Sequence, residues 1–329
     1  HTSLSKRIDL VEKAMEYFKE NIESIARNIT LQMGKPINQS RNEVKGMLLR
    51  SETVCGFAED ALKDISLPKL EGYNRFIHRE PLGVVLDIAA WNYPLLIAVN
   101  VVVPAILAGN AVAIKHSSLT PLCGIAFEEA FLHTGAPEGL VTALILDHHD
   151  TESIIQADLI HHIAFTGSVD GGRRIHQSAS DRFMDVGLEL GGKDPAYVRE
   201  DANIDSALSG IMDGVFYNTG QSCCAVERIY VHKSLLNEFI EGAIKFMGKL
   251  KIGNPLDDST DIGPLAQNLG VQTIKGQLKD AEDKGAKIIC HPGSIPEGGQ
   301  YLLPAILTNV NHSMKVMIEE TFGPIVGIM

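Results

Sequence analysis

Short apolar runs and helix-like stretches alternate from Pro81 onward, and this alternation limits the folds open to the chain more than any other feature. The apolar runs are predicted to be strands at residues 83–88, 111–115, 140–146, 162–165 and 184–190. Helices are predicted between them at residues 94–108 and 120–133, near Thr151 and from near Gly171. Apolar strands separated by helices are typical of a parallel sheet covered on both faces, so we predict an α/β fold.

The pattern restarts after Gly191-Gly192, with strands predicted at residues 195–198 and 228–232 and helices at 204–217 and 234–250. We therefore expect a domain boundary near these two glycines. Ahead of the first sheet, apolar residues spaced by three and four from Leu4 to Ile29 predict one long helix that ends near Gly34-Lys35-Pro36. Another helix is predicted over roughly residues 37–63. Residues 67–80 are predicted to form an extended segment or a surface hairpin.

Charge and hydropathy exclude two classes of partner. The net charge of −12 and the lack of a basic stripe argue against nucleic acid. No apolar run reaches the roughly 18 residues of a membrane span, so no membrane partner is expected. Five cysteines form an odd set without framework spacing, which is typical of a reducing compartment, and we expect a cytoplasmic protein.

Cys223 is the first candidate for chemistry, in the run Gly220-Gln221-Ser222-Cys223-Cys224. A thiolate attacks carbonyl carbon well, and a loop containing glycine lets backbone N–H groups converge on an oxyanion. The alternative is a buried structural thiol, which is the commoner state of an isolated cysteine and the one we keep for Cys224.

Glu189 and Asn92 are the next candidates for catalysis, and each also has a simple structural interpretation. Glu189 stands among apolar residues before two glycines, which suits a general base near neutral pH. Its alternative is a glutamate at a strand end that faces water. The side-chain amide of Asn92 could donate to an oxyanion. Its alternative is the N-cap of the helix that begins near Pro94.

Two further features suit a nucleotide cofactor. The glycine-rich turn after Phe165, which includes Gly167 and Ser168, follows a strand and opens a helix, a geometry that binds phosphate. Lys115 ends a strand and could reach a ribose hydroxyl or a phosphate, although an exposed lysine is the alternative. The pairs His148-His149 and His161-His162 lack metal-ligand spacing, and we predict no metal site.

Together these motifs resemble the aldehyde dehydrogenase family, over roughly residues 6–326. The motifs that carry the resemblance are Trp91-Asn92-Tyr93-Pro94, Phe165-Thr166-Gly167-Ser168, Leu188-Glu189-Leu190-Gly191-Gly192-Lys193, Gly220-Gln221-Ser222-Cys223 and Glu320-Thr321-Phe322-Gly323-Pro324.

The resemblance implies a domain plan. Residues 1–66 and 81–191 would form a Rossmann-like dinucleotide-binding domain, residues 67–80 an oligomerisation hairpin and residues 192–329 an α/β catalytic domain that is incomplete. It also implies a homodimer or homotetramer in the full-length form.

The resemblance further implies that an aldehyde is oxidised to an acid with NAD or NADP. Cys223 would attack the aldehyde, Asn92 and the Cys223 N–H would hold the oxyanion, and Glu189 would activate water. The cofactor contacts would come from Trp91, Lys115, Ser118, Gly167, Ser168, Glu320 and Phe322.

The sequence departs from the family pattern at one cofactor position. NAD-preferring members commonly carry a glutamate three residues after the lysine, where this chain has Ser118. Serine neither repels nor strongly binds a 2′-phosphate, so we expect NADP to be tolerated or modestly preferred.

The second departure is length, because family members continue well beyond the Glu320–Pro324 motif. We expect a chain that ends here to be inactive or poorly assembled.

A CoA-acylating semialdehyde dehydrogenase lacks the glutamate base, so Glu189 argues against that alternative. A non-catalytic homologue is favoured only by the length. Succinic semialdehyde would need a cationic anchor, for which Arg182 and Arg228 are present but not placed by the sequence.

Overall fold

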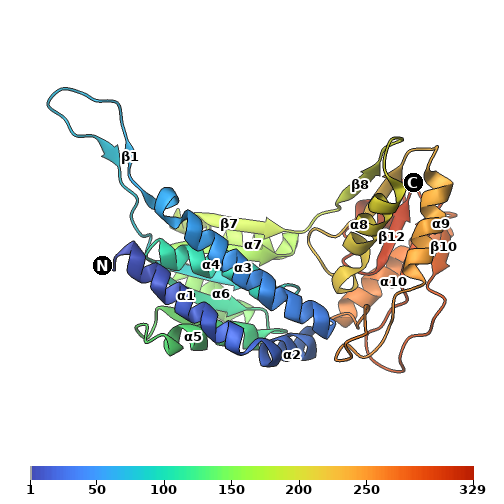
Figure 1. Ribbon diagram of the computed structural model, residues 1–329, viewed down its shortest axis with the longest axis horizontal. Helices are drawn as coiled ribbons and strands as arrows, with labels where there is room; N and C mark the ends of the chain where they lie inside the picture. Colours follow the sequence, from blue (N-terminus) through green and yellow to red (C-terminus); the bar gives the residue numbers. More distant parts are fainter. Residues whose placement is uncertain (1) are drawn as a thin grey trace. The chain divides into compact units, whose positions relative to one another are not determined.

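A computed structural model describes residues 2–329 of the chain (Figure 1). The chain folds into two compact units. The first consists of residues 2–28 and Arg41–Leu190, and the second of Ile29–Ser40 and Gly191–Met329. Each unit is built on a five-stranded sheet with helices on both faces, which confirms the predicted α/β class.

The sheet of the first unit is parallel throughout, with the strand order β5-β4-β3-β6-β7. Its strands are β3 (Val84–Ala89), β4 (Ala111–His116), β5 (Val141–Ala143), β6 (His162–Gly167) and β7 (Val186–Leu190). The chain runs from β3 outward to β4 and β5 and then returns to the other side of β3 with β6. The connections therefore reverse direction at β3, the place where parallel sheets bind ligands.

Helices cover both faces of this sheet because its central strands are apolar on both sides. Helices α4 (Pro94–Leu107) and α5 (Pro121–His133) pack on β3, β4 and β5, while α7 (Val169–Ala179) packs on β6 and β7 beside α6 (His148–Gln156). A cluster that includes Leu86, Ile163, Phe165 and Ile175 fills the space under α7.

The prediction of one continuous helix from Leu4 to near Gly34 is wrong, because the helix is divided at Asn21. Helix α1 spans Leu4–Glu20, α2 spans Ile22–Met33 and α3 spans Ile37–Leu62. The side-chain Nδ2 of Asn21 donates to the Tyr17 carbonyl over 2.8 Å, and the Asn21 backbone N–H donates to the same oxygen over 3.1 Å. A short amide side chain that binds the nearby backbone in this way competes with helix continuation.

Strand β7 is shorter and more exposed than the buried strand predicted over residues 184–190. Gly187, Leu188 and Glu189 are all exposed. The physical reason is position, since β7 lies at the edge of its sheet and pairs only with β6.

The segment after α3 forms a small antiparallel ribbon, in which β1 (Ile65–Ser66) pairs with β2 (Phe76–Ile77). Figure 1 shows it extending away from the helices of the same unit. The exposed large apolar side chains of this ribbon include Ile65, Leu70, Tyr73, Phe76 and Ile77.

The sheet of the second unit is mixed, with the order β10-β11-β12-β9-β8. Its strands are β8 (Pro195–Val198), β9 (Arg228–Val231), β10 (Lys287–Cys290), β11 (Ala305–Thr308) and β12 (Ile325–Ile328), and only β10 runs antiparallel to its neighbour. Its helices are α8 (Ile204–Phe216), η2 (Tyr217–Gly220), α9 (Leu236–Met247), α10 (Asn268–Asp283) and α11 (Lys315–Ile318). One apolar cluster includes Phe216, Phe239 and Val326, and another includes Ile274, Leu307 and Ile325.

Residues 29–40 fold with the second unit, although the sequence places them in the first domain. The Ile37 N–H donates to the Pro255 carbonyl over 2.8 Å, and the Asn218 N–H donates to Oε1 of Gln39 over 2.8 Å. Gly34 has a φ of +81°, and a β-carbon there would lie 2.8 Å from Cγ of Pro264. Among residues 2–329, no helix combines the length and apolar character needed to cross a bilayer.

Candidate active site

Seven of the predicted site residues lie at the end of the first unit's sheet where its parallel strands finish. Trp91 and Asn92 follow β3, Lys115 and Ser118 lie at the end of β4, Gly167 and Ser168 at the end of β6, and Glu189 near the end of β7. The carboxyl ends of parallel strands meet at a single edge, so the topology gathers these residues at the place where the connections reverse.

Asn92 does not cap the helix that follows it, so the N-cap interpretation is wrong. Helix α4 begins at Pro94, with Tyr93 as the N-cap residue. The buried carboxylate of Glu43 accepts hydrogen bonds from the N–H groups of Leu95 at 2.8 Å and Leu96 at 3.4 Å. Helix α3 therefore supplies this cap, and the side chain of Asn92 is only 3% exposed.

The end of β4 is buried and fixed, so Lys115 is not the exposed lysine of the alternative interpretation. Burial lowers the pKa of Lys115, and the charge of Asp147 partly opposes that shift. The neighbouring His116 donates from Nε2 to the Pro94 carbonyl over 2.9 Å and accepts at Nδ1 from the Thr120 hydroxyl over 3.1 Å. Burial also lowers the pKa of His116 to about 4, so a neutral imidazole joins the end of β4 to the start of α4.

The glycine-rich turn after β6 has a packing function as well as an open helix end. Ser168 caps α7 and its Oγ accepts from the Gly171 N–H at 3.1 Å. A β-carbon on Gly167 or Gly171 would lie within 2.7 or 2.8 Å of Cζ of Phe165. The glycines therefore let the backbone lie close to this ring. The exposed first turn of α7 and the buried ammonium of Lys115 lie at the same edge, which fits a nucleotide that carries phosphates.

Glu189 is exposed, so the prediction of apolar surroundings is wrong. The apolar residues around it in sequence lie on an edge strand and do not enclose it. Its Cα pairs with Thr166 in the register of β6 and β7, which places the carboxylate one residue away from the Gly167–Ser168 turn along the neighbouring strand.

Cys223 lies in the second unit on an exposed turn between η2 and β9. Partial desolvation raises the pKa of its thiol, and the adjacent thiol of Cys224 raises it further. Cys224 is also exposed, and its Sγ lies 3.3 Å from Oγ of Ser222. Neither cysteine is the buried structural thiol of the alternative interpretation.

Three consecutive left-handed residues lead to Cys223. Asn218, Thr219 and Gly220 have φ values of +54°, +56° and +74°, and all three are buried. The Gly263 N–H donates to Oγ1 of Thr219 over 3.1 Å, and the Ala266 N–H donates to Oε1 of Gln221 over 3.0 Å. Such strain in a non-glycine backbone persists only where its surroundings over-determine it, and it gathers at functional sites.

The Glu320–Pro324 motif lies against the same loop and against Gly191-Gly192. The Glu320 carboxylate accepts from the Gly192 N–H at 3.3 Å, and a β-carbon on Gly191 would overlap that carboxylate. Burial raises the pKa of Glu320, and the charge of Glu227 raises it further. Phe322 is half-buried and has a φ of +54°.

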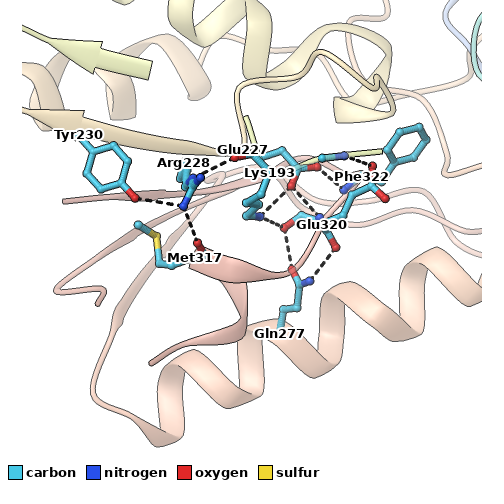
Figure 2. A network of polar contacts seen from close by, with 10 residues as sticks. Lys193, Glu227, Arg228, Tyr230, Gln277, Met317, Glu320 and Phe322 are labelled. Atoms are coloured by element: carbon cyan, nitrogen blue, oxygen red, sulfur yellow. Dashed lines mark hydrogen bonds and ion pairs between the residues drawn. The ribbon is translucent and has the colours of Figure 1, made fainter. Parts of the chain in front are cut away.

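Figure 2 shows a polar network behind this motif that sequence reasoning missed. Lys193 and Glu227 form an ion pair over 2.8 Å, with side chains only 7% and 6% exposed. Gln277 of α10 and Thr321 complete the network. The only signal in the sequence was a charged residue just ahead of each of two strands, with Lys193 two residues before β8 and Glu227 directly before β9. Nothing in the sequence pairs Lys193 with Glu227.

The two arginines considered as substrate anchors both have structural partners. Arg228 donates from Nε to the Lys193 carbonyl over 2.9 Å. Arg182 donates to the carbonyls of Ile155, Ala157 and Ile160, and it forms an ion pair with Asp158 over 2.6 Å. Neither is a ready anchor for a carboxylate on the substrate.

Asp147, His149 and Asp150 bring ligand atoms within 4.8 Å of one another at the surface. All three are exposed, and His149 and Asp150 already form an ion pair over 3.5 Å. Exposed acidic groups of this kind are common without an ion, so we assign this cluster no role.

The aldehyde dehydrogenase family matches the chain over residues 1–329. An aldehyde dehydrogenase of Paenarthrobacter nicotinovorans is 34% identical over 333 residues, which cover 99% of this chain and 72% of that protein. An NADP⁺ succinate-semialdehyde dehydrogenase of Deinococcus radiodurans is 33% identical over 326 residues, which cover 98% and 67%. The succinic semialdehyde dehydrogenase of Streptococcus pyogenes, solved with NADP⁺, superposes with a TM-score of 0.94 at 26% identity, covering 100% of this chain and 72% of that one.

Proposed function

Because this chain belongs to the aldehyde dehydrogenase family, we propose that it oxidises an aldehyde to a carboxylic acid with NAD or NADP, using Cys223 as the nucleophile. One observation carries the proposal: an exposed thiol follows three buried left-handed residues that hydrogen bonds hold in place. A structural cysteine needs neither the exposure nor the strain.

Cys223 would act by adding its sulfur to the carbonyl carbon, forming a thiohemiacetal. Its raised pKa means that the thiol must first lose a proton to a base. We assign the oxyanion donors to the Asn92 amide and the Cys223 backbone N–H. A nicotinamide cofactor, when bound, would accept the hydride from this adduct, and the acyl group would remain on Cys223 as a thioester.

Glu189 is the proposed base for the second half-reaction. An exposed carboxylate can reach bulk water, take a proton from one molecule and direct the resulting hydroxide to the thioester. Overall, aldehyde, water and NAD(P)⁺ yield acid, NAD(P)H and a proton, and the Cys223 thiol is regenerated.

For the cofactor, we propose contacts in both units. Lys115 would bind the adenosine ribose, with Ser118 beside it, while Gly167 and Ser168 would approach the pyrophosphate and Trp91 would lie nearby. In the second unit, Glu320 would bind the nicotinamide ribose and Phe322 would pack near the nicotinamide. We propose that NADP is accepted and modestly preferred, in line with Ser118 and with the NADP⁺ named for two of the relatives.

The test is an aldehyde panel assayed with both cofactors on intact protein of verified mass. Succinic semialdehyde and butanal form an informative pair, because they differ by one carboxylate and both candidate arginines have structural partners. Cys223→Ala should abolish NAD(P)H formation. Cys290→Ala is the matched control, since Cys290 is also an exposed thiol but lies on β10. Continued turnover by Cys223→Ala would refute the mechanism.

We also propose that residues 67–80 contribute to a homodimer or homotetramer. The exposed apolar side chains of the β1–β2 ribbon support this, since an open antiparallel ribbon can pair with another strand. Light scattering of the intact protein, compared with a Phe76→Asp, Ile77→Lys double variant, tests it. An unchanged molar mass would contradict it.

A further inference from the structure

The carboxylate of Glu227 holds two consecutive backbone N–H groups of the Glu320–Pro324 motif (Figure 2). Its Oε2 accepts from the Thr321 N–H at 2.8 Å, and its Oε1 accepts from the Phe322 N–H at 2.9 Å. Glu227 directly precedes β9 and the motif directly precedes β12. These strands are parallel neighbours, with Arg228 paired to Gly327. The sheet therefore sets the carboxylate and the motif opposite each other.

The motif needs such support because its backbone is unfavourable. Phe322 has a φ of +54°, a left-handed conformation that an aromatic residue rarely adopts. A residue in that region keeps its conformation only when its neighbours fix it. A carboxylate that binds the N–H groups of Thr321 and Phe322, which belong to the peptide groups on either side of the Thr321 Cα, does this directly.

Lys193 balances the buried charge and extends the support to the rest of the motif. Its Nζ lies 2.8 Å from Oε2 of Glu227 and donates to Oγ1 of Thr321 over 2.7 Å. The Thr321 hydroxyl in turn donates to Oε1 of Gln277 over 2.7 Å, and Nε2 of Gln277 donates to the Glu320 carbonyl over 3.0 Å. Each residue from Glu320 to Phe322 is thus held by at least one contact from this network.

We propose that Glu227, with its charge balanced by Lys193, is a positioning residue that fixes the Glu320 carboxylate and the Phe322 ring for the nicotinamide half of the cofactor. This inference rests on the proposed function, which gives Glu320 and Phe322 their cofactor contacts. It adds a residue that touches neither substrate nor cofactor and acts through the backbone it holds.

A glutamine in place of Glu227 is the sharpest perturbation. It keeps the size of the side chain but offers one oxygen instead of two, so one of the two N–H groups loses its acceptor. Its NH₂ group would also face an N–H or the Lys193 ammonium. Glu227→Asp keeps both oxygens on a shorter stem and should recover part of the effect.

The experiment measures the dissociation constants of NADPH, NADH, ADP and 2′,5′-ADP by nucleotide fluorescence and calorimetry. The two adenosine phosphates lack the nicotinamide riboside. Glu227→Gln should weaken NADPH and NADH binding by about tenfold, the loss expected for one charge-assisted hydrogen bond, and leave ADP and 2′,5′-ADP unchanged. The kcat should fall, while the KM for the aldehyde should change little.

Arg228→Met is the matched control, because it disturbs the same buried network through the Lys193 and Met317 carbonyls without touching residues 320–322. It should lack the selective effect on the nicotinamide nucleotides. Equal losses for all four nucleotides in Glu227→Gln, or no loss at all, would overturn the proposal. If Glu227→Gln does not fold, Thr321→Val removes the hydroxyl contacts and should give the same selectivity. Wild-type protein that binds no nicotinamide nucleotide would instead refute the proposed function.

Discussion

Gly220 lies directly against Gly323, so that a β-carbon on Gly220 would overlap the Gly323 carbonyl group. Gly220 also has a φ of +74°, which other residues rarely adopt. This contact joins the loop that carries Cys223 to the motif that carries Glu320 and Phe322. Neither loop can move without displacing the other.

Gly220→Ala should therefore destabilise the protein by about 2 to 4 kcal/mol, from the steric overlap and the left-handed backbone together. It should also slow the alkylation of Cys223, since the loop must shift. Gly276→Ala is the control, because Gly276 lies within α10 and no heavy atom would come within 4 Å of its added β-carbon. That variant should gain about 0.5 to 1 kcal/mol. Urea denaturation measures both, and equal stabilities would contradict the contact.

The thiol of Cys223 should become reactive only at alkaline pH, because desolvation and Cys224 raise its pKa above 9.0. The thiolate is the attacking species, so the rate of iodoacetamide labelling should rise by about tenfold per pH unit between pH 7 and 9. Mass spectrometry of the Cys223 peptide follows it. Cys224→Ser should shift the labelling profile to lower pH, because it removes the contribution of the Cys224 thiol to the raised pKa of Cys223. A plateau below pH 8 in the wild type would show a stabilised thiolate instead.

Asp87 should make the protein less stable as pH rises. It lies in the central strand β3, is 1% exposed, and its Oδ2 has no hydrogen-bond partner among residues 2–329. Burial raises its folded-state pKa well above 3.8, so the folded state keeps a proton that the unfolded chain releases. Stability from this group is present below pH 3.8 and decreases above it, by up to about 1.4 kcal/mol per pH unit.

Asp87→Asn should flatten this slope, measured by urea denaturation from pH 4 upward. Asp60→Asn is the control. The hydrogen bond from Lys63 lowers the pKa of the exposed Asp60, so its effect has the opposite sign. Parallel stability curves for wild type and Asp87→Asn would show that Asp87 does not titrate in this way.

Ser118→Glu should shift cofactor preference toward NAD. Ser118 is exposed at the end of β4, beside the proposed ribose contact Lys115, and a carboxylate there would repel a 2′-phosphate. The kcat/KM ratio of NADP to NAD should fall by about tenfold or more, while Ser118→Ala should leave the ratio nearly unchanged. A wild-type enzyme with a strong NAD preference would contradict the interpretation of Ser118.

The sequence was most informative where the signal is local. Periodicity located the strands of the first sheet with the helices between them, and β8, α8, β9 and α9 of the second unit, because burial on one or both faces leaves a repeating pattern. No prediction covered α10, β10, β11 or α11. Periodicity failed where a single side chain determines the end of a helix, as at Asn21, whose amide ends α1. It also failed at Glu189, because apolar neighbours in sequence do not reveal that a strand lies at a sheet edge.

Contacts distant in sequence could not be predicted at all. The cap of α4 comes from Glu43, 52 residues before Leu95, and Glu227 reaches Thr321 across 94 residues. Motifs locate the residues proposed to touch substrate and cofactor, but the residues that hold them are fixed by the packing of strands and helices. For that reason the Lys193–Glu227 pair emerged only from the structure.

The placement of residues 29–40 has a consequence for how this protein can be synthesised and divided. During translation this stretch leaves the ribosome long before its packing partners Pro255 and Pro264. It therefore cannot make its native contacts until most of the chain has been synthesised. A fragment that begins at Gly191 would lack the contacts that residues 34–39 make with the second unit, including the hydrogen bond from the Asn218 N–H to Gln39. The second unit is therefore not a contiguous piece of the gene, and a peptide of residues 29–40 supplied in trans should restore folding to a fragment of residues 191–329.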